Sequence, residues 1–176
     1  MLPEPRNPDR YRIALVCLGN ICRSPVADVV VNARIDTAGL AGCVTVDSSG
    51  TGGWHVGNPM DHRAAATLVG DGYDPTAHRA RQFTADLVES YDLVLAMDRS
   101  NRAELRRLGV PEGRLRLFRD FDPQPGDGEV PDPYFGGDRG FSDVLAMVER
   151  TSIGLVAELQ ARLGSRSGVH ARARRR

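Results

Sequence analysis

The residues of this chain best suited to chemistry are a cysteine and an arginine six positions apart, Cys17 and Arg23, in the segment CLGNICRS. A cysteine thiolate is a strong nucleophile, and a guanidinium offers a planar fork of donors that fits two oxygens of a phosphoryl group. All 23 basic residues of the chain are arginine, so this spacing alone is weak evidence. The secondary structure predicted from the flanking residues must therefore decide whether Cys17 and Arg23 form a site.

The flanking residues predict a strand before Cys17 and a helix after Arg23. Residues 11–16 (YRIALV) are a short apolar run typical of a buried strand, and Ser24 with Pro25 predicts the N-cap and first turn of a helix that continues to Ile35. A loop between a strand and a helix N-terminus points backbone N–H groups at one spot, where the helix dipole also favours an anion. We therefore predict a phosphate-binding loop at residues 17–24.

Each residue type in this loop suits that task. Gly19 permits a tight turn, and Asn20 tolerates left-handed backbone geometry. The N–H groups and Arg23 would stabilise a thiolate at Cys17, and Ser24 can donate its hydroxyl to the sulfur. If Cys17 were only a small buried residue and Arg23 an exposed helix charge, the composition of the loop would have no explanation. The predicted loop residues besides Cys17 and Arg23 are Leu18, Gly19, Asn20, Ile21, Cys22 and Ser24.

A candidate acid lies in the irregular segment 120–140, which is rich in Pro, Gly and Asp. Cleavage of a phosphate monoester needs a group that protonates the departing oxygen, and Asp132 of VPDPYFGG is the candidate. Pro133 keeps Asp132 out of helical geometry, and Tyr134 with Phe135 could shield it from water. Asp-Pro pairs in such loops usually form turns, and that role is the alternative for Asp132.

Apolar runs alternate with helical patterns along the chain. Strands are expected at 11–16, 44–48, 93–97 and 115–118, and helices at 24–35, 59–69, 100–108 and 141–163. This alternation predicts an α/β fold in a single domain, with a four-stranded parallel sheet flanked by helices on both faces and the phosphate-binding loop after the first strand. Ligands of such sheets bind beyond the carboxyl ends of the strands, where Cys17 lies.

Length and composition predict one globular domain. The chain has 176 residues, 41% of them hydrophobic and 26% charged. We expect a flexible segment at 1–10, the folded domain at 11–163, and a basic, disordered tail at 164–176 that begins where Gly164 ends the last helix. The tail holds five arginines and no acidic residue, so its alternative role is contact with nucleic acid or with an acidic partner. Nucleic acid is an unlikely partner, because the 23 basic and 23 acidic residues of the whole chain balance.

The cysteines and histidines predict no metal site and no disulfide framework. The three cysteines, Cys17, Cys22 and Cys43, match neither a zinc pattern nor paired bridges, so we expect free thiols. Cys22 is five residues from Cys17 and is either a redox partner that protects the nucleophile or a plain buried thiol. With no apolar run long enough to span a membrane and no signal-peptide pattern, we expect a cytoplasmic protein with no membrane partner.

Several motifs in one order resemble a known family. The segments VCLGNICRSP, SSGTGGWHVGNPMDHRA, AHRARQ, LAMDRSN and the late Asp-Pro-Tyr are similar to segments of the low-molecular-weight protein tyrosine phosphatases, over about residues 11–163. The resemblance implies hydrolysis of phosphotyrosine through a phosphocysteine on Cys17. It implies that Arg23 holds the phosphoryl group, Ser24 supports the thiolate and Asp132 is the general acid and base, with no cofactor.

The resemblance also implies roles around the loop. Asn20, with Ser49 and His78 nearby, would brace the loop by hydrogen bonds, although the family usually reads S-A-G where this chain has Ser49. The substrate mouth would be lined by Leu18, Trp54, Tyr134 and Phe135; without the resemblance, the three aromatic residues would be assigned to the core. The implied partners are phosphotyrosine-containing proteins and inorganic phosphate, as product and competitive ligand, for a monomer or weak homodimer.

Three other functions fit the loop less well. Arsenate reductases of this fold relay electrons through later cysteines, and none follows Cys43. Protein arginine phosphatases of the family typically carry threonine where this chain has Ile21. A phosphate-binding module without catalysis would have no use for Cys17, Arg23 and Asp132 together. The sequence therefore predicts a phosphotyrosine phosphatase.

Overall fold

A four-stranded parallel sheet forms the centre of the molecule in the computed structural model, which describes residues 1–173, with side chains described as far as residue 163. The strands are β1 (Tyr11–Cys17), β2 (Val44–Gly50), β3 (Leu93–Ala96) and β4 (Leu115–Leu117), in the order β2-β1-β3-β4. β1 pairs with β2 from Tyr11↔Val44 to Cys17↔Gly50 and with β3 on its other side. The predicted α/β fold with a parallel sheet is confirmed.

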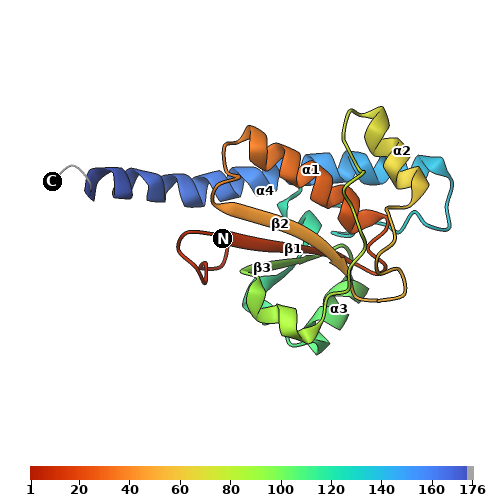
Figure 1. Cartoon of the computed structure of the whole chain (residues 1–176), viewed down its shortest axis with the longest axis horizontal. Helices are drawn as coiled ribbons and strands as arrows, with labels where there is room; N and C mark the ends of the chain where they lie inside the picture. Colours follow the sequence, from red (N-terminus) through yellow and green to blue (C-terminus); the bar gives the residue numbers. More distant parts are fainter. Residues whose placement is uncertain (174–176) are drawn as a thin grey trace.

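Helices cover both faces of this sheet (Figure 1). Successive side chains of β1 point to opposite faces, so Ile13 and Leu15 pack beneath α1 and α4, whereas Ala14 and Val16 join the core on the side of α3. α2 packs on α4. The α-helices are α1 (Arg23–Thr37), α2 (His62–Gly70), α3 (Arg99–Arg107) and α4 (Asp138–Ala173), and 3₁₀ turns occupy Ala85–Ser90, Glu112–Arg114 and Phe118–Phe121.

The carboxyl end of β1 is the point where the strand order reverses. The chain adds β2 on one side of β1 and then crosses to place β3 on the other side. The connections that leave the neighbouring strands therefore diverge, and a crevice opens between them at this end. Cys17, the last residue of β1, stands at that crevice.

The four helices begin one to three residues from the predicted positions, and for α1 and α2 the N-caps explain the difference. α1 begins at Arg23 with Cys22 at its N-cap, so Ser24 lies inside the helix and does not cap it. The N-cap of α2 is Asp61, whose carboxylate accepts a hydrogen bond from the backbone N–H of Arg63 at 2.9 Å. Because of this capping carboxylate, α2 begins at His62 and not at the proline at position 59.

Some of the first ten residues contact the domain: Leu2 is only 4% exposed, and the N–H of Arg6 donates to Asp92 at 2.6 Å. α4 continues past Gly164 to Ala173, because a glycine costs a formed helix only about 1 kcal/mol and does not stop it. Residues 174–176 of the predicted tail lie outside the described residues.

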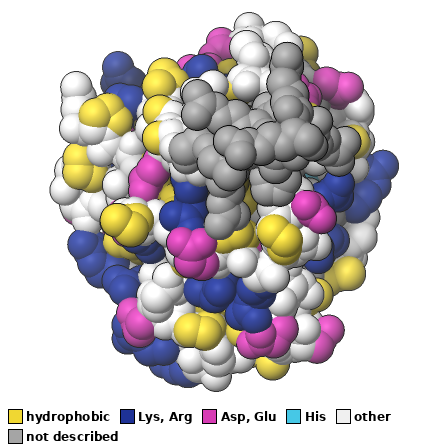
Figure 2. All heavy atoms as spheres, turned by 90° about the vertical axis from the view of Figure 1, so that its left-hand side faces the viewer, with side chains coloured by type: hydrophobic (Ala, Val, Ile, Leu, Met, Phe, Trp, Pro, Cys, Tyr) yellow, Lys and Arg dark blue, Asp and Glu magenta, His cyan; other side chains and the backbone are white. Residues whose placement is uncertain are grey.

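Figure 2 shows the end of the molecule opposite the crevice, where arginines stand among acidic and apolar side chains. Arg114 donates to the backbone carbonyls of Glu4 and Asp92. Over residues 1–173, no helix has the length and apolar character that a bilayer span requires.

Candidate active site

The loop after β1 is held by hydrogen bonds to its backbone carbonyls. The carbonyl of Cys17 accepts from the N–H of Thr51 at 2.9 Å, and that of Leu18 from Gly52 at 2.8 Å. The carbonyl of Ile21 accepts at 2.8 Å from the backbone N–H at the N-cap of α2. These bonds use the loop carbonyls, while the N–H of Asn20 is directed at the sulfur of Cys17, as an anion-binding nest requires.

Asn20 is fully buried and fixes the curvature of the loop. It is the one residue other than glycine with positive φ, 55°, within the described chain. Its Nδ2 donates to the hydroxyls of Ser24 at 2.9 Å and Ser48 at 3.1 Å, and its Oδ1 accepts from the N–H of Arg81 at 2.9 Å. Its own carbonyl lies 2.8 Å from Nε2 of His78. One side chain thus joins the loop to α1, β2 and the segment before the 3₁₀ turn at Ala85–Ser90.

The glycines near the loop permit close approach of neighbouring segments. The turn that we assigned to Gly19 is made by Asn20; a Cβ on Gly19 would instead lie 3.0 Å from Cδ2 of His55. A Cβ on Gly50 would meet the carbonyl oxygen of Leu18 at 2.7 Å, closer than real Cβ contacts come. The absence of both side chains lets β2 and the His55 segment lie directly against the loop.

The sulfur of Cys17 accepts two hydrogen bonds. The hydroxyl of Ser24 lies 3.0 Å from it and the backbone N–H of Asn20 lies 3.3 Å from it. The hydroxyl of Ser24 has a single hydrogen, which can be donated either to this sulfur or to the carbonyl of Ser49 at 3.2 Å. Two donors directed at one sulfur suit an anionic thiolate.

Ser49 and His78 both make hydrogen bonds with residues of the loop. Ser49 contributes its backbone carbonyl, while its buried hydroxyl has no partner among the described residues; the hydroxyl that contacts Asn20 belongs to Ser48. Burial lowers the pKa of His78, and Arg81 and Arg79 act in the same direction. The imidazole is therefore neutral at pH 7, with the hydrogen on Nε2 shared with the carbonyl of Asn20.

Arg23 lies at the centre of the site with its side chain only 4% exposed. Its Nη1 donates to Asp98 at 2.5 Å and to the carbonyl of Val130 at 3.1 Å, and its Nη2 lies 3.3 Å from Asp132. Burial alone would lower the pKa of Arg23, but the charges of Cys17, Asp98 and Asp132 outweigh it and raise the pKa. Sequence reasoning missed Asp98, although its position directly after β3 in LAMDRSN was a usable signal.

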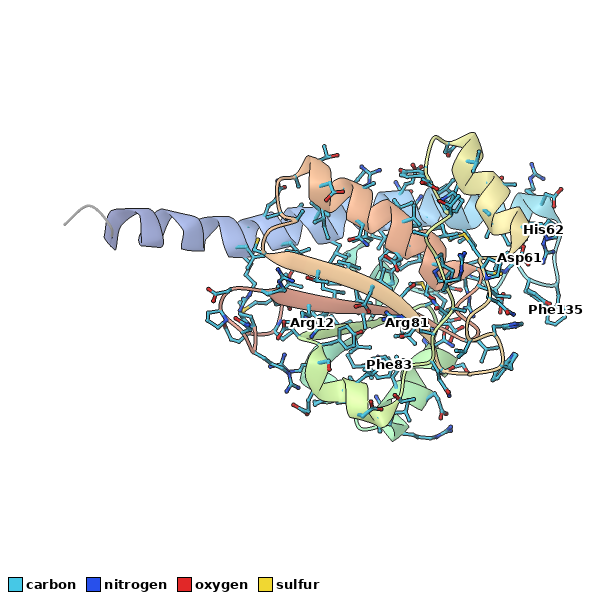
Figure 3. The ribbon with its side chains drawn as sticks, viewed as in Figure 1. Arg12, Asp61, His62, Arg81, Phe83 and Phe135 are labelled. Atoms are coloured by element: carbon cyan, nitrogen blue, oxygen red, sulfur yellow. The ribbon has the colours of Figure 1, made fainter. Side chains whose placement is uncertain are left out.

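The predicted catalytic and mouth residues share one cleft of about 420 Å³. Trp54 is 67% exposed and Phe135 96% exposed, so these aromatic side chains are at the surface and not in the core. Figure 3 shows Phe135 at the end of the molecule where Asp61 also lies. His55, which sequence reasoning did not single out, also lines the cleft. The lining residues are Cys17, Leu18, Gly19, Ile21, Cys22, Arg23, Trp54, His55, Asp132, Tyr134 and Phe135.

The three cysteines are free thiols, and Cys22 differs from Cys17 in its surroundings. Burial raises the pKa of Cys22 to about 12, assisted by the negative charges of Asp61 and Cys17. Cys22 therefore remains a protonated thiol at neutral pH. Among the side chains that the structure describes, no group of His, Cys, Asp or Glu is arranged to hold a metal ion.

The bracing by Asn20 leads to a first prediction. Asn20→Ala removes the amide that donates to the hydroxyls of Ser24 and Ser48 and accepts from the N–H of Arg81, and it places alanine at positive φ. The unfolding free energy should therefore fall by about 2–4 kcal/mol. Affinity for inorganic phosphate should fall with it, as measured by calorimetry beside urea denaturation. Asn58→Ala, at an exposed position, is the matched control and should change neither quantity. Unchanged phosphate affinity in the Asn20 variant would contradict the bracing role.

Comparisons with known proteins agree with this geometry. A family model described as low molecular weight phosphotyrosine protein phosphatase matches residues 12–165. A low molecular weight protein-tyrosine-phosphatase of Streptomyces coelicolor is 46% identical over 162 residues, which cover 89% of this chain and 98% of that one. The chain is similar to the crystal structure of an Entamoeba histolytica protein tyrosine phosphatase with Hepes in the active site (TM-score 0.81, 32% identity, 86% and 97% of the two chains).

A Drosophila arginine phosphatase also has a similar structure, with TM-score 0.77 and 27% identity over 84% of this chain and 97% of that one. The agreement of family model, curated relative and solved structures covers nearly the whole folded domain. By these matches and by the geometry of the loop after β1, the chain belongs to the low molecular weight phosphotyrosine protein phosphatase family.

Proposed function

We propose that this phosphatase hydrolyses phosphotyrosine in proteins through a covalent phosphocysteine on Cys17. The observation that supports this most directly is the sulfur of Cys17, which accepts hydrogen bonds from Ser24 and Asn20 in the cleft that also contains Arg23 and Asp132. A nucleophile, a phosphoryl clamp and an acid at one site are the groups that two-step phosphoryl transfer needs.

In the first step the thiolate of Cys17 attacks phosphorus, and the bond from phosphorus to the aryl oxygen breaks. The loop N–H groups and Arg23 stabilise the charge on the equatorial oxygens of the phosphoryl group. Asp132, protonated at this stage, gives its proton to the departing phenolate oxygen. The products are a neutral phenol, a phosphorylated Cys17 and an Asp132 carboxylate.

In the second step water attacks the same phosphorus from the side that the phenol has left. The Asp132 carboxylate takes a proton from this water, the bond from sulfur to phosphorus breaks, and the thiolate of Cys17 is restored. Inorganic phosphate leaves the cleft, where it also acts as a competitive ligand. The residues of this chain complete the cycle without a cofactor.

Arg23 is held in a position that leaves one edge of its guanidinium available. Its two Nη1 hydrogens are used by Asp98 and the carbonyl of Val130, and one Nη2 hydrogen by Asp132. Within the described residues, the Nε hydrogen and the second Nη2 hydrogen have no acceptor. These two donors lie on the same edge, as bidentate contact with two phosphoryl oxygens requires.

The walls of the cleft support an aromatic phosphate ester as the substrate. Leu18, Trp54, Tyr134 and Phe135 present apolar surface above the loop, and the rings of Tyr134 and Phe135 meet edge to face with centroids 4.9 Å apart. A phenyl ring between such walls gains stacking and apolar burial that a short serine side chain cannot. Phosphotyrosine is the protein phosphate with this shape.

The mechanism predicts distinct defects for its two central residues. Cys17→Ser should abolish turnover of an aryl phosphate while phosphate binding by calorimetry persists. Asp132→Ala should lower kcat by about 10²–10⁴-fold for poor leaving groups, because the phenolate then departs unprotonated. Cys43→Ser, outside the cleft, should retain full activity. Appreciable turnover by the Cys17 variant would exclude the covalent mechanism.

The substrate class is tested by comparing phosphotyrosine, phosphoserine and phosphoarginine peptides of one sequence. We expect kcat/KM to be highest for phosphotyrosine, because the aromatic walls favour its ring and Ile21 lies in the cleft. A preference for phosphoarginine would assign the chain to the alternative activity that the Drosophila structure represents.

Cys22 supports a second proposal, a reversible disulfide with Cys17. Peroxide oxidises the Cys17 thiolate to a sulfenic acid and water is released; the Cys22 thiol then displaces a second water to form the disulfide. Peptide mass mapping after peroxide treatment should show a Cys17–Cys22 link, and dithiothreitol should restore activity. In Cys22→Ser, peroxide inactivation should become irreversible. Equal recovery of both proteins would contradict the protective role.

A further inference from the structure

The segment that carries Asp132 has little of its own structure to hold it in place. Pro133 is buried, but Asp132, Tyr134 and Phe135 are exposed, and glycines follow at 136 and 137. Within the segment, Asp132 accepts from the N–H of Tyr134 at 3.1 Å. A proton donor must lie within hydrogen-bond reach of the leaving oxygen, so a further contact has to fix this segment above the cleft.

Arg63, from the first turn of α2, makes that contact. Its guanidinium carbon lies 5.5 Å from the centroid of the Tyr134 ring and 4.6 Å from that of Phe141. Tyr134 belongs to the segment that carries Asp132, and Phe141 lies in the first turn of α4, where that segment ends. One planar cation therefore contacts both ends of the segment through aromatic faces, an arrangement that a lysine does not reproduce.

Arg63 is itself fixed by Asp61 at the N-cap of α2. Its Nε and Nη2 donate to the two carboxylate oxygens of Asp61 at 3.1 and 3.0 Å. Burial would raise the pKa of Asp61, but the hydrogen bonds from Arg63 outweigh it and hold the pKa below its usual value. The backbone N–H of Asp61 donates to the carbonyl of Ile21 in the phosphate-binding loop at 2.8 Å. Figure 3 shows Asp61 at the cleft end of the molecule.

We propose that Arg63 is a positioning residue that holds the Asp132 segment in register with the phosphate-binding loop. The contacts run without a break from Ile21 through Asp61 and Arg63 to Tyr134, two residues from Asp132. Arg63 does not line the cleft, so its own position is outside the space that substrate occupies. The contact between Arg23 and Asp132, in contrast, lies where the phosphoryl group binds. This inference rests on the proposed role of Asp132 as the acid.

The test measures kcat/KM, which reports the steps up to formation of the phosphoenzyme, for a series of aryl phosphates whose phenols range from strongly to weakly acidic. Arg63→Met keeps the aliphatic stem and removes the guanidinium. We expect kcat/KM to fall about 10- to 100-fold for the poorest leaving groups and to change little for activated ones, because in this first step only the former need a well-placed acid. Asp132→Ala should show the same dependence, more steeply. The inhibition constant of inorganic phosphate should remain that of the wild type.

Arg106→Met is the matched control, since Arg106 is also paired with a carboxylate, Glu112, but lies on α3. It should match the wild type for every substrate. Asp61→Asn retains an N-cap side chain and weakens the hold on Arg63, so it should show the dependence of Arg63→Met to a smaller extent, with Tm measured to verify the fold.

Two results would overturn the proposal. If Arg63→Met reduces kcat/KM equally for all leaving groups, or not at all, while Asp132→Ala shows the expected dependence, Arg63 does not position the acid. If Asp132→Ala itself shows no dependence on the leaving group, Asp132 is not the acid and both assignments fall.

Discussion

The geometry of the site depends on one buried amide, that of Asn20. Its left-handed φ of 55° bends the loop, and its side chain offsets that conformation by bonding Ser24, Ser48 and the backbone of Arg81. The amide is itself fully buried, and these three hydrogen bonds satisfy its polar atoms, which would be costly to bury without partners. The same network orients the Ser24 hydroxyl toward the sulfur of Cys17. Curvature of the loop and activation of the nucleophile thus have one physical cause.

A second constraint brings distant segments to this loop. The strand order β2-β1-β3-β4 places the ends of β1 and β3 side by side, so Asp98 after β3 reaches Arg23 on α1. Arg23 is thereby charged, buried and fixed at once, and it faces both Cys17 and Asp132. The buried guanidinium charge is acceptable because two carboxylates and a backbone carbonyl compensate it, while two donors remain available for a phosphoryl group.

Features encoded by neighbouring residues could be predicted from the sequence. The four strands and the loop at 17–24 follow from short apolar runs and from the residues that break them. Asp98 and Arg63 were missed because their roles arise from contacts across 75 and about 70 residues, which no local pattern reports. The sequence analysis named Ser49, whereas the hydroxyl that contacts Asn20 belongs to Ser48. Adjacent residues of a strand point to opposite faces of the sheet, and the sequence did not indicate which of the two points toward Asn20. The end of α4 was misplaced because glycine weakens a helix without always ending it.

The account's central claim is a phosphoryl group bound covalently to Cys17. The most direct measurement uses Asp132→Ala with p-nitrophenyl phosphate, a substrate whose leaving group departs without an acid. The first step then proceeds while the second lacks its base, so phosphoenzyme should accumulate and survive a rapid quench. Peptide mass spectrometry should locate the phosphate on Cys17. Phosphate on any other residue, or turnover with no phosphoenzyme in a Cys17→Ser protein, would contradict the account.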